Sequence, residues 1–140
     1  MISIQKLPIN LYPEIKCIKR FNIYKDNQTT FIRDTLREEE WKIIENISYN
    51  NLEAMVRKTK WEINTIESLE LLFNELISDK QVNLDIINML SNIYFWTSSI
   101  VSTRTVSTIK LDYDTNQLDE KAEPKDSICV GIVTRKIRGF

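Results

Sequence analysis

Histidine is absent from this sequence, and glycine and cysteine each occur only twice among its 140 residues. Without histidine, the chain lacks the commonest general base, the usual zinc ligand and any serine–histidine triad. Glycine stands only at Gly131 and Gly139. This excludes a phosphate-binding loop, a dinucleotide-binding turn and a nucleophile elbow, because each needs glycine where the backbone approaches a ligand. Cys17 and Cys129 form no CxxC pair, so we interpret both as small buried apolar residues and predict neither a cofactor nor a metal site.

Long apolar runs are also missing. The most apolar stretch, residues 84–96, contains Asp85, Asn88 and Asn92 and is too short to cross a bilayer. The first residues have neither a basic start nor a long apolar segment, so we expect no signal peptide. These features predict a soluble cytoplasmic protein without membrane contact.

The composition is that of a globular chain encoded by an AT-rich gene. Apolar residues make up 42% and charged residues 28%, an ordinary balance for a folded chain of this length. We therefore expect one domain over residues 1–140. Isoleucine, lysine and asparagine, whose codons are AT-rich, contribute 45 residues, whereas alanine contributes two. This bias indicates an AT-rich genome and says nothing about function.

The net charge of −1 conceals an uneven distribution along the chain. Residues 1–33 carry six basic and two acidic side chains, and residues 34–98 carry six basic and twelve acidic ones. The remaining residues have a net charge of +1. The ends of the chain are thus basic and the middle is acidic.

Both ends of the chain have the pattern of β-strands. Residues 2–11 and 15–24 are rich in β-branched side chains and alternate roughly, which is typical of extended segments, and residues 25–28 indicate a turn. Towards the other end, residues 105–113 and 127–137 alternate in the same way. Because these last two runs flank an acidic stretch, we expect a C-terminal β-hairpin with a long loop.

Helical periodicity dominates the middle of the chain. Thr35 and Glu38 have the spacing of a capping box, and Asn64 with Glu67 repeats that spacing before a wide apolar stripe. The expected helices cover residues 35–48, 52–58, 64–78 and 83–95. The predicted fold class is therefore α+β, with a central bundle of about four helices flanked by N-terminal β segments and the C-terminal hairpin.

Residues 51–82 resemble the second and third helices of a helix-turn-helix. With residues 35–48 as the first helix and the terminal hairpin as the wing, the chain resembles a winged-helix domain. Val56 departs from this family's pattern, which usually has alanine there, and so does Lys60, where glycine is frequent. The third helix carries no Lys or Arg and would be repelled by DNA phosphates. The resemblance therefore implies a protein-interaction module.

Residues 112–123 place acidic or amide side chains at the calcium-binding positions of an EF-hand loop. Gln117, however, occupies the position at which that loop requires glycine for its sharp turn. The flanking segments also have the pattern of strands, whereas an EF-hand needs helices. We therefore favour a solvated hairpin loop over a calcium site.

The function favoured by these patterns is that of a small non-enzymatic regulatory or accessory protein that binds a protein partner. Tryptophan and arginine are the residue types that most often anchor interfaces. They occur together in the predicted turn after the second helix, so the candidate partner-binding residues are Arg57, Lys58, Lys60 and Trp61.

A nucleic-acid-binding regulator is the alternative. Basic side chains near both ends stand beside Phe21, Tyr24 and Phe140, and cations beside aromatic rings suit single-stranded nucleic acid if the two segments pair. The residues of this alternative site are Lys16, Lys19, Arg20, Arg135, Lys136 and Arg138. A carboxylate-dependent enzyme ranks last, with an acidic cluster at Asp34, Glu38, Glu39 and Glu40 as its only support.

Overall fold

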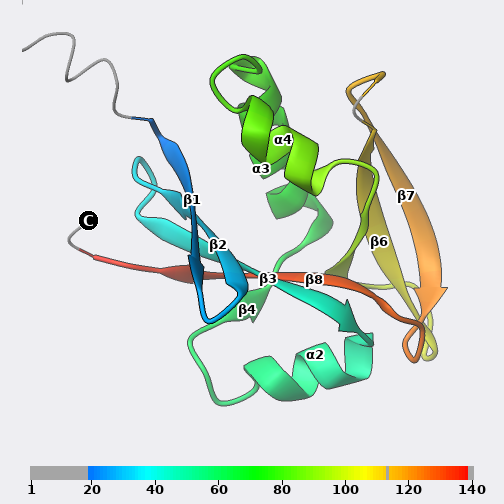
Figure 1. Cartoon of the computed structure of the whole chain (residues 1–140). Helices are drawn as coiled ribbons and strands as arrows, with labels where there is room; N and C mark the ends of the chain where they lie inside the picture. The colour runs from blue at the N-terminus through cyan, green and yellow to red at the C-terminus, as the bar shows by residue number, and fades with distance from the viewer. Residues whose placement is uncertain (1–18, 113, 139–140) are drawn as a thin grey trace, which may run out of the picture.

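A computed structural model of the chain describes residues 19–112 and 114–138. Within these residues the chain forms an eight-stranded sheet and three helices (Figure 1). The strands are β1 (Phe21–Asp26), β2 (Thr29–Asp34), β3 (Glu39–Ile47), β4 (Glu62–Ile63), β5 (Tyr94–Ile100), β6 (Thr105–Asp112), β7 (Gln117–Pro124) and β8 (Cys129–Lys136). The helices are α2 (Tyr49–Val56), α3 (Ile66–Ser78) and α4 (Leu84–Leu90).

The sheet has the strand order β1-β2-β3-β8-β5-β6-β7, and β4 pairs with β8 beside this path. Every pairing is antiparallel except that between β5 and β8, which consists of Phe95 opposite Val130. Figure 1 shows α3 and α4 together on one side of the sheet and α2 on the other. Central strands of such a sheet are covered on both faces.

Two hydrophobic cores result from this three-layer arrangement. The larger, which we call the α3 core, lies between the sheet and helices α3 and α4, and the smaller, the α2 core, lies against α2. Buried residues of the α3 core are Phe21, Ile32, Trp41, Leu69, Leu72, Phe73, Leu76, Ile86, Ile87, Leu90, Phe95, Ile109, Leu111 and Ile132. Those of the α2 core are Ile47, Tyr49, Leu52, Trp96, Val106 and Val133.

The predicted alternation in the last strand is confirmed. Val130 and Ile132 pack into the α3 core, whereas Cys129 and Val133 pack into the α2 core. The predicted second and third helices are also present as α2 and α3, although Thr65 rather than Asn64 caps α3, its side chain accepting a hydrogen bond from the Ser68 amide. None of the helices within the described residues is long and apolar enough to cross a bilayer.

The predicted first helix, residues 35–48, is wrong, because this segment forms a turn and then β3. Asp34 holds the turn, since its Oδ1 accepts hydrogen bonds from the backbone amides of Leu36 and Arg37. In β3, Trp41 faces the α3 core and Ile44 the α2 core, and the register shifts before Ile47. A strand with both faces buried and a bulge thus imitates helical spacing.

The central four-helix bundle and the winged-helix resemblance are therefore also wrong. The fold is built on a sheet. Of the predicted fourth helix, residues 83–95, only the first half is helical, and it forms α4. Ser91 follows that helix with extended dihedral angles, and Asn92 then has a φ of 63°, after which the chain enters β5. Apolar residues continue past the helix end because β5 is covered on both faces, by the α3 core at Phe95 and the α2 core at Trp96.

The predicted C-terminal hairpin is wrong as well. β6 pairs with β7, and the acidic stretch expected to be a loop is mostly strand β7 itself. Asp112 lies opposite Gln117, so a short turn replaces the twelve-residue loop of an EF-hand. β8 instead crosses to the middle of the sheet and pairs with β3. The predicted strand over residues 2–11 lies outside the described residues.

Candidate functional site

The candidate site lies on the same face of the sheet as α2, beside the part of that face that the α2 core covers. β1 and β2 form a hairpin whose two turn residues, Asn27 and Gln28, have φ values of 50° and 69°. Positive values at both positions are typical of a type I′ turn, which matches the twist of paired strands. In this register Tyr24 lies opposite Phe31, and their rings stack with centroids 5.0 Å apart and an interplanar angle of 10°.

Trp61 adds a third ring to this pair. It ends the loop of residues 57–61, directly before β4, and its ring centroid lies 6.3 Å from that of Phe31. The pairing of β4 with β8 fixes this position, because Ile63 lies opposite Val133. All three rings are half-buried, so each keeps part of its surface open to solvent.

Three cationic side chains lie against the rings. The guanidinium of Arg33 is 4.4 Å from the ring centroid of Tyr24, and that of Arg135 is 4.5 Å from the ring centroid of Trp61. The ammonium of Lys42 lies 5.6 Å from the same Trp61 ring. We call this set the aromatic–cation surface and define it as Tyr24, Phe31, Arg33, Lys42, Trp61 and Arg135.

Glu40 holds two of these cations in place. Its side chain is 1% exposed and lies across from Arg33 on β2 and from Arg135 on β8. Arg33 Nε donates to one carboxylate oxygen at 3.1 Å, and Arg135 donates to the other from Nε at 3.2 Å and from Nη2 at 2.9 Å. One carboxylate therefore orients two guanidinium groups. Because Lys42 adds a third cation, the surface retains an excess of positive charge.

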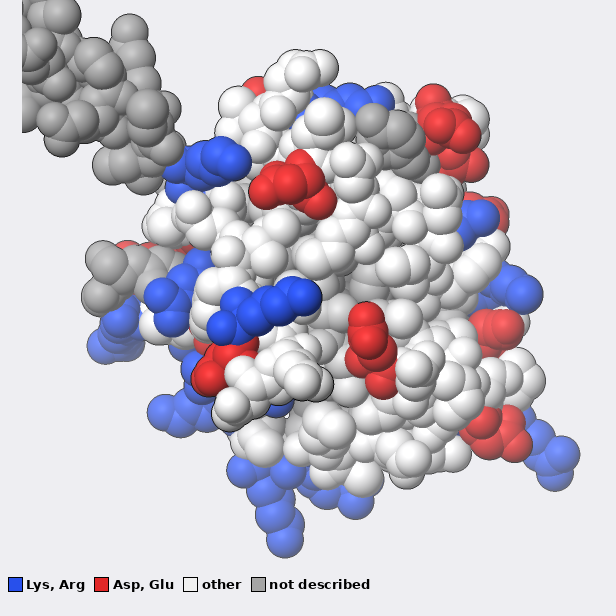
Figure 2. Space-filling view, in the orientation of Figure 1, with Lys and Arg blue, Asp and Glu red and all other residues white. Residues whose placement is uncertain are grey.

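The residues predicted to bind a protein partner lie together in the loop after α2, and they are Arg57, Lys58, Lys60 and Trp61. Arg57 is exposed and pairs with Glu53 one helical turn earlier, at an N–O distance of 3.5 Å. Lys58 and Lys60 are also exposed. Figure 2 shows Lys and Arg predominating on the side of the molecule that carries this loop and the β1–β2 hairpin.

The residues predicted to bind nucleic acid are more dispersed, and they are Lys16, Lys19, Arg20, Arg135, Lys136 and Arg138. This alternative required the two terminal segments to pair, and β1 and β8 do not, because β2 and β3 lie between them. Arg20 pairs with Asp34 and Glu75 on the α3 face, and Lys136 pairs with Glu39. Lys19 and Arg138 are exposed, Lys16 lies outside the described residues, and Arg135 belongs to the aromatic–cation surface.

The acidic cluster of residues 34–40 is divided between the two faces of the sheet. Asp34 lies opposite Glu39, and both line the α3 face, whereas Glu40 points to the other side. Glu38 lies in the turn with a φ of 53°. Among the described residues, no group of Cys, Asp or Glu side chains is arranged to hold a metal ion.

Sequence reasoning missed Tyr24, Phe31, Arg33 and Lys42 as one site. A signal for the first pair was available, because Tyr24 and Phe31 each stand three residues from the turn at Asn27 and Gln28. Equal spacing from a two-residue turn makes two residues cross-strand neighbours. No comparable signal existed for Trp61, whose position depends on the long-range pairing of β4 with β8.

The aromatic–cation surface can hold flat rings by stacking and anionic groups by charge. In comparisons with known proteins, no protein-family model, no curated protein and no solved structure matches this chain.

Proposed function

We propose that the aromatic–cation surface binds single-stranded nucleic acid. The observation that carries this proposal is the row of three half-buried rings, Tyr24, Phe31 and Trp61, on one face of the sheet with cations against two of them. Unpaired bases stack on such rings, and every base has a face that can do so. Bases within a duplex are already stacked on one another and are not available to a flat surface of this kind.

The charge of the surface supports an anionic ligand. Arg33 and Arg135 share the single carboxylate of Glu40, and Lys42 contributes a further positive charge beside Trp61. Loop residues Lys58 and Lys60 extend the positive region at its margin. The slightly negative net charge of the whole chain is compatible with this proposal, because local charge determines attraction over distances of about 10 Å at ordinary ionic strength.

Fluorescence anisotropy with labelled oligonucleotides of about 12 nucleotides tests the proposal. We expect single-stranded DNA and RNA to bind more tightly than a duplex of the same length. With three phosphate contacts, affinity should fall about twentyfold between roughly 50 and 200 mM salt. Trp61→Ala should weaken binding about tenfold, since stacking contributes roughly 1–3 kcal/mol per base. Lys42→Ala should reduce the salt dependence and leave Glu40 paired.

Tyr94→Ala is the matched control. The ammonium groups of Lys110 and Lys121 lie 5.1 Å and 5.5 Å from the ring centroid of Tyr94. Tyr94 is on β5, however, which lies on the opposite side of β8 from β1, β2 and β3. This variant should bind oligonucleotides as the unchanged protein does. Absence of binding at low salt, or equal losses in the Tyr94→Ala and Trp61→Ala variants, would overturn the proposal.

A protein partner at the same loop is the second candidate function. It is favoured by Trp61 in the loop that follows α2 and by Met55, an apolar residue that is 48% exposed near the end of that helix. Tryptophan and methionine are enriched at the centres of interfaces. In affinity capture, a partner held by this loop should be retained by the unchanged protein and by Tyr94→Ala but lost with Trp61→Ala. Retention by all three proteins would exclude this loop as the binding site.

A further inference from the structure

A hollow of about 410 Å³ adjoins the aromatic–cation surface next to the β1–β2 turn, which Figure 1 shows directed towards α2 and the loop after it. Lys42 belongs to both the hollow and the surface. Phe31 lies opposite Lys42, and two residues that line the hollow, Thr29 and Ile44, each stand two positions from this pair in the direction of the turn. The hollow therefore begins one side-chain row, about 7 Å, from the pair.

The hollow is lined by two kinds of side chain. Ile43, Ile44 and the 48% exposed Met55 are apolar. The polar residues are Lys25, Gln28, Thr29, Thr30, Lys42 and Glu45. Apart from the contact of Lys42 with the Trp61 ring, these six side chains have no hydrogen-bond, ion-pair or ring partner among the described residues. Size and lining are those of sites that hold small ligands, which measure roughly 300–1,000 Å³.

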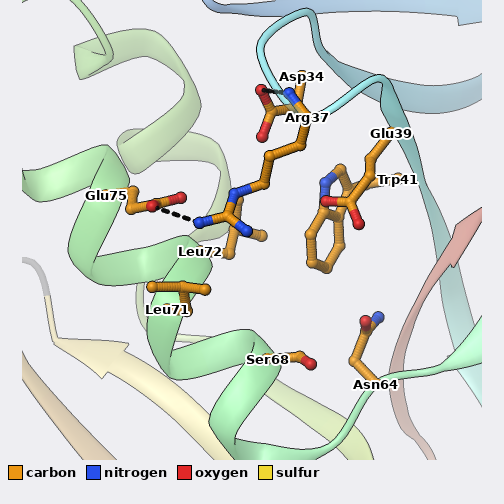
Figure 3. Close-up of a pocket in the computed structure, with 9 residues that line it drawn as sticks. All are labelled: Asp34, Arg37, Glu39, Trp41, Asn64, Ser68, Leu71, Leu72 and Glu75. Carbon is orange, nitrogen blue, oxygen red and sulfur yellow. Dashed lines mark hydrogen bonds and ion pairs between the residues drawn. The ribbon is translucent and has the colours of Figure 1, made fainter. Parts of the chain in front are cut away.

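A cavity on the opposite face of the sheet differs in this respect. It measures about 80 Å³, and Figure 3 shows Arg37 reaching across it to Glu75. Asp34, which also lines it, accepts hydrogen bonds from Arg20 and from two backbone amides. Because its polar groups bind one another, it is less suited to a ligand than the hollow beside Lys42.

The lining of the hollow suits a single nucleotide. Lys25 and Lys42 bring two positive charges against the one carboxylate of Glu45, which leaves an excess of positive charge for a phosphate. Ile44 and Met55 provide apolar surface for the face of a base. A strand whose bases stack on the rings passes the hollow at Lys42, so its next nucleotide can enter.

The carboxylate of Glu45 determines which base fits. A carboxylate only accepts hydrogen bonds, so the edge of the base that faces it must donate them. Guanine presents two adjacent donors on its pairing edge, N1–H and the N2 amino group, which match the two carboxylate oxygens. On the pairing edges of the other bases every donor has only acceptors beside it, and a carboxylate oxygen would repel these.

We propose that this hollow binds one nucleotide of the strand held by the aromatic–cation surface, and that Glu45 selects guanine there. This inference rests on the proposed function, because the stacked neighbouring bases hold the strand in place. The guanine N1–H and N2 amino group donate to the Glu45 carboxylate. The ring lies against Ile44 and Met55, and the phosphate lies beside Lys42.

Fluorescence anisotropy with the full chain and labelled DNA strands of about 12 nucleotides tests this inference. One strand contains thymine alone, and in three others a single central base is replaced by guanine, adenine or cytosine. We expect the guanine strand to bind about tenfold more tightly than the other three, as is typical of a bidentate contact. In Glu45→Gln this advantage should be lost, whereas the thymine strand should bind at least as tightly as before, because a negative charge is removed.

Glu67→Gln is the matched control, since Glu67 is an exposed glutamate on α3, on the opposite face of the sheet. It should keep the full guanine preference. Trp61→Ala should weaken all four strands alike, because Trp61 does not line the hollow.

The outcomes distinguish this inference from the function on which it rests. Trp61-dependent binding with less than about a twofold preference for guanine would overturn the inference and leave the proposed function standing. A preference that persisted in Glu45→Gln would also overturn it and would indicate an arginine contact with guanine instead. Absence of binding by all four strands would overturn both.

Discussion

At the scale of single residues, Glu75 connects α3 to the sheet through two arginines. Its carboxylate oxygens accept hydrogen bonds at 2.8 Å from Arg20, which precedes β1, and from Arg37, in the turn between β2 and β3. Partial burial by itself would raise the pKa of Glu75, but the hydrogen bonds from Arg37 and Arg20 outweigh this effect and lower it. The ionised form is thus more favourable in the folded protein than in the unfolded chain.

Replacing Glu75 with glutamine should reveal this contribution as a pH dependence. A lowered pKa in the folded state stabilises the protein above the pKa of the unfolded chain, about 4.3 for glutamate, and this gain is lost as the pH falls through the folded pKa. At pH 7 we expect Glu75→Gln to lower the free energy of unfolding by about 1 kcal/mol. The difference between the two proteins should shrink towards zero below about pH 4. Urea denaturation at several pH values measures it.

Glu53→Gln is the control for this experiment. Glu53 also pairs with an arginine, Arg57, but both side chains are at least half exposed, and Arg57 is only four residues from Glu53, at the C-terminal end of α2. Exposed pairs of this kind contribute less than about 0.5 kcal/mol. A pH-independent loss in Glu75→Gln, or an equal loss in Glu53→Gln, would contradict the assigned role.

At the scale of elements, the position of α2 depends on Gly131. A Cβ atom at this residue of β8 would lie 2.8 Å from Leu52 Cδ1 and 3.1 Å from Leu52 Cδ2. Leu52 is fully buried in the α2 core, so the helix approaches the strand as closely as it does because residue 131 has no side chain. We therefore expect Gly131→Val to destabilise the protein by about 1–3 kcal/mol through overpacking.

A double substitution separates this steric effect from a loss of strand geometry. Leu52→Ala alone should cost about 2–5 kcal/mol because it leaves a cavity. Combined with Gly131→Val it should cost less than the sum of the two changes, since the valine fills part of that cavity. Additive losses in thermal or urea denaturation would show that Leu52 is not the residue that the valine side chain meets.

The helices and strands also show which parts of the fold could be predicted from the sequence and which could not. α3 follows from its apolar stripe, and β8 from its alternation, because both patterns are local. β3 and β5 do not, since each is covered on both faces and its apolar residues no longer have a period of two. The partner of β8 was also mistaken, because strand pairing across about 90 residues leaves no local trace.

The candidate site was predictable only in part for the same reason. Trp61 and Arg135 were each identified from the sequence, but as members of two different surfaces. Their contact results from the position of β4 beside β8, which no spacing in the sequence reveals. The hollow beside Lys42 had no sequence signal at all, since it is lined by parts of a turn, a strand and a helix that only the folded chain brings together.

At the scale of the whole molecule, β8 joins two halves of the sheet. One half contains β1, β2 and β3, and the other contains β5, β6 and β7. The ladder between β8 and β5 is a single residue pair, Phe95 opposite Val130, so backbone pairing alone gives a weak connection. Side chains supply the rest, because the α3 core includes Ile32 and Trp41 from the first half and Ile109 from the second.

We therefore expect the two halves to unfold together. A shared core of this size makes separate opening of β5, β6 and β7 costly, and the Trp96 indole adds a hydrogen bond at 2.8 Å to the Ile47 carbonyl of β3. A Trp96→Phe variant keeps Trp41 on β3 of the first half, together with Trp61 in the loop before β4, whereas a Trp41→Phe, Trp61→Phe variant keeps only Trp96 on β5 of the second half. In each variant the urea midpoint from fluorescence should equal that from far-ultraviolet circular dichroism. A lower fluorescence midpoint for the protein that retains only Trp96 would show that packing across β8 is too weak to make the sheet one cooperative unit.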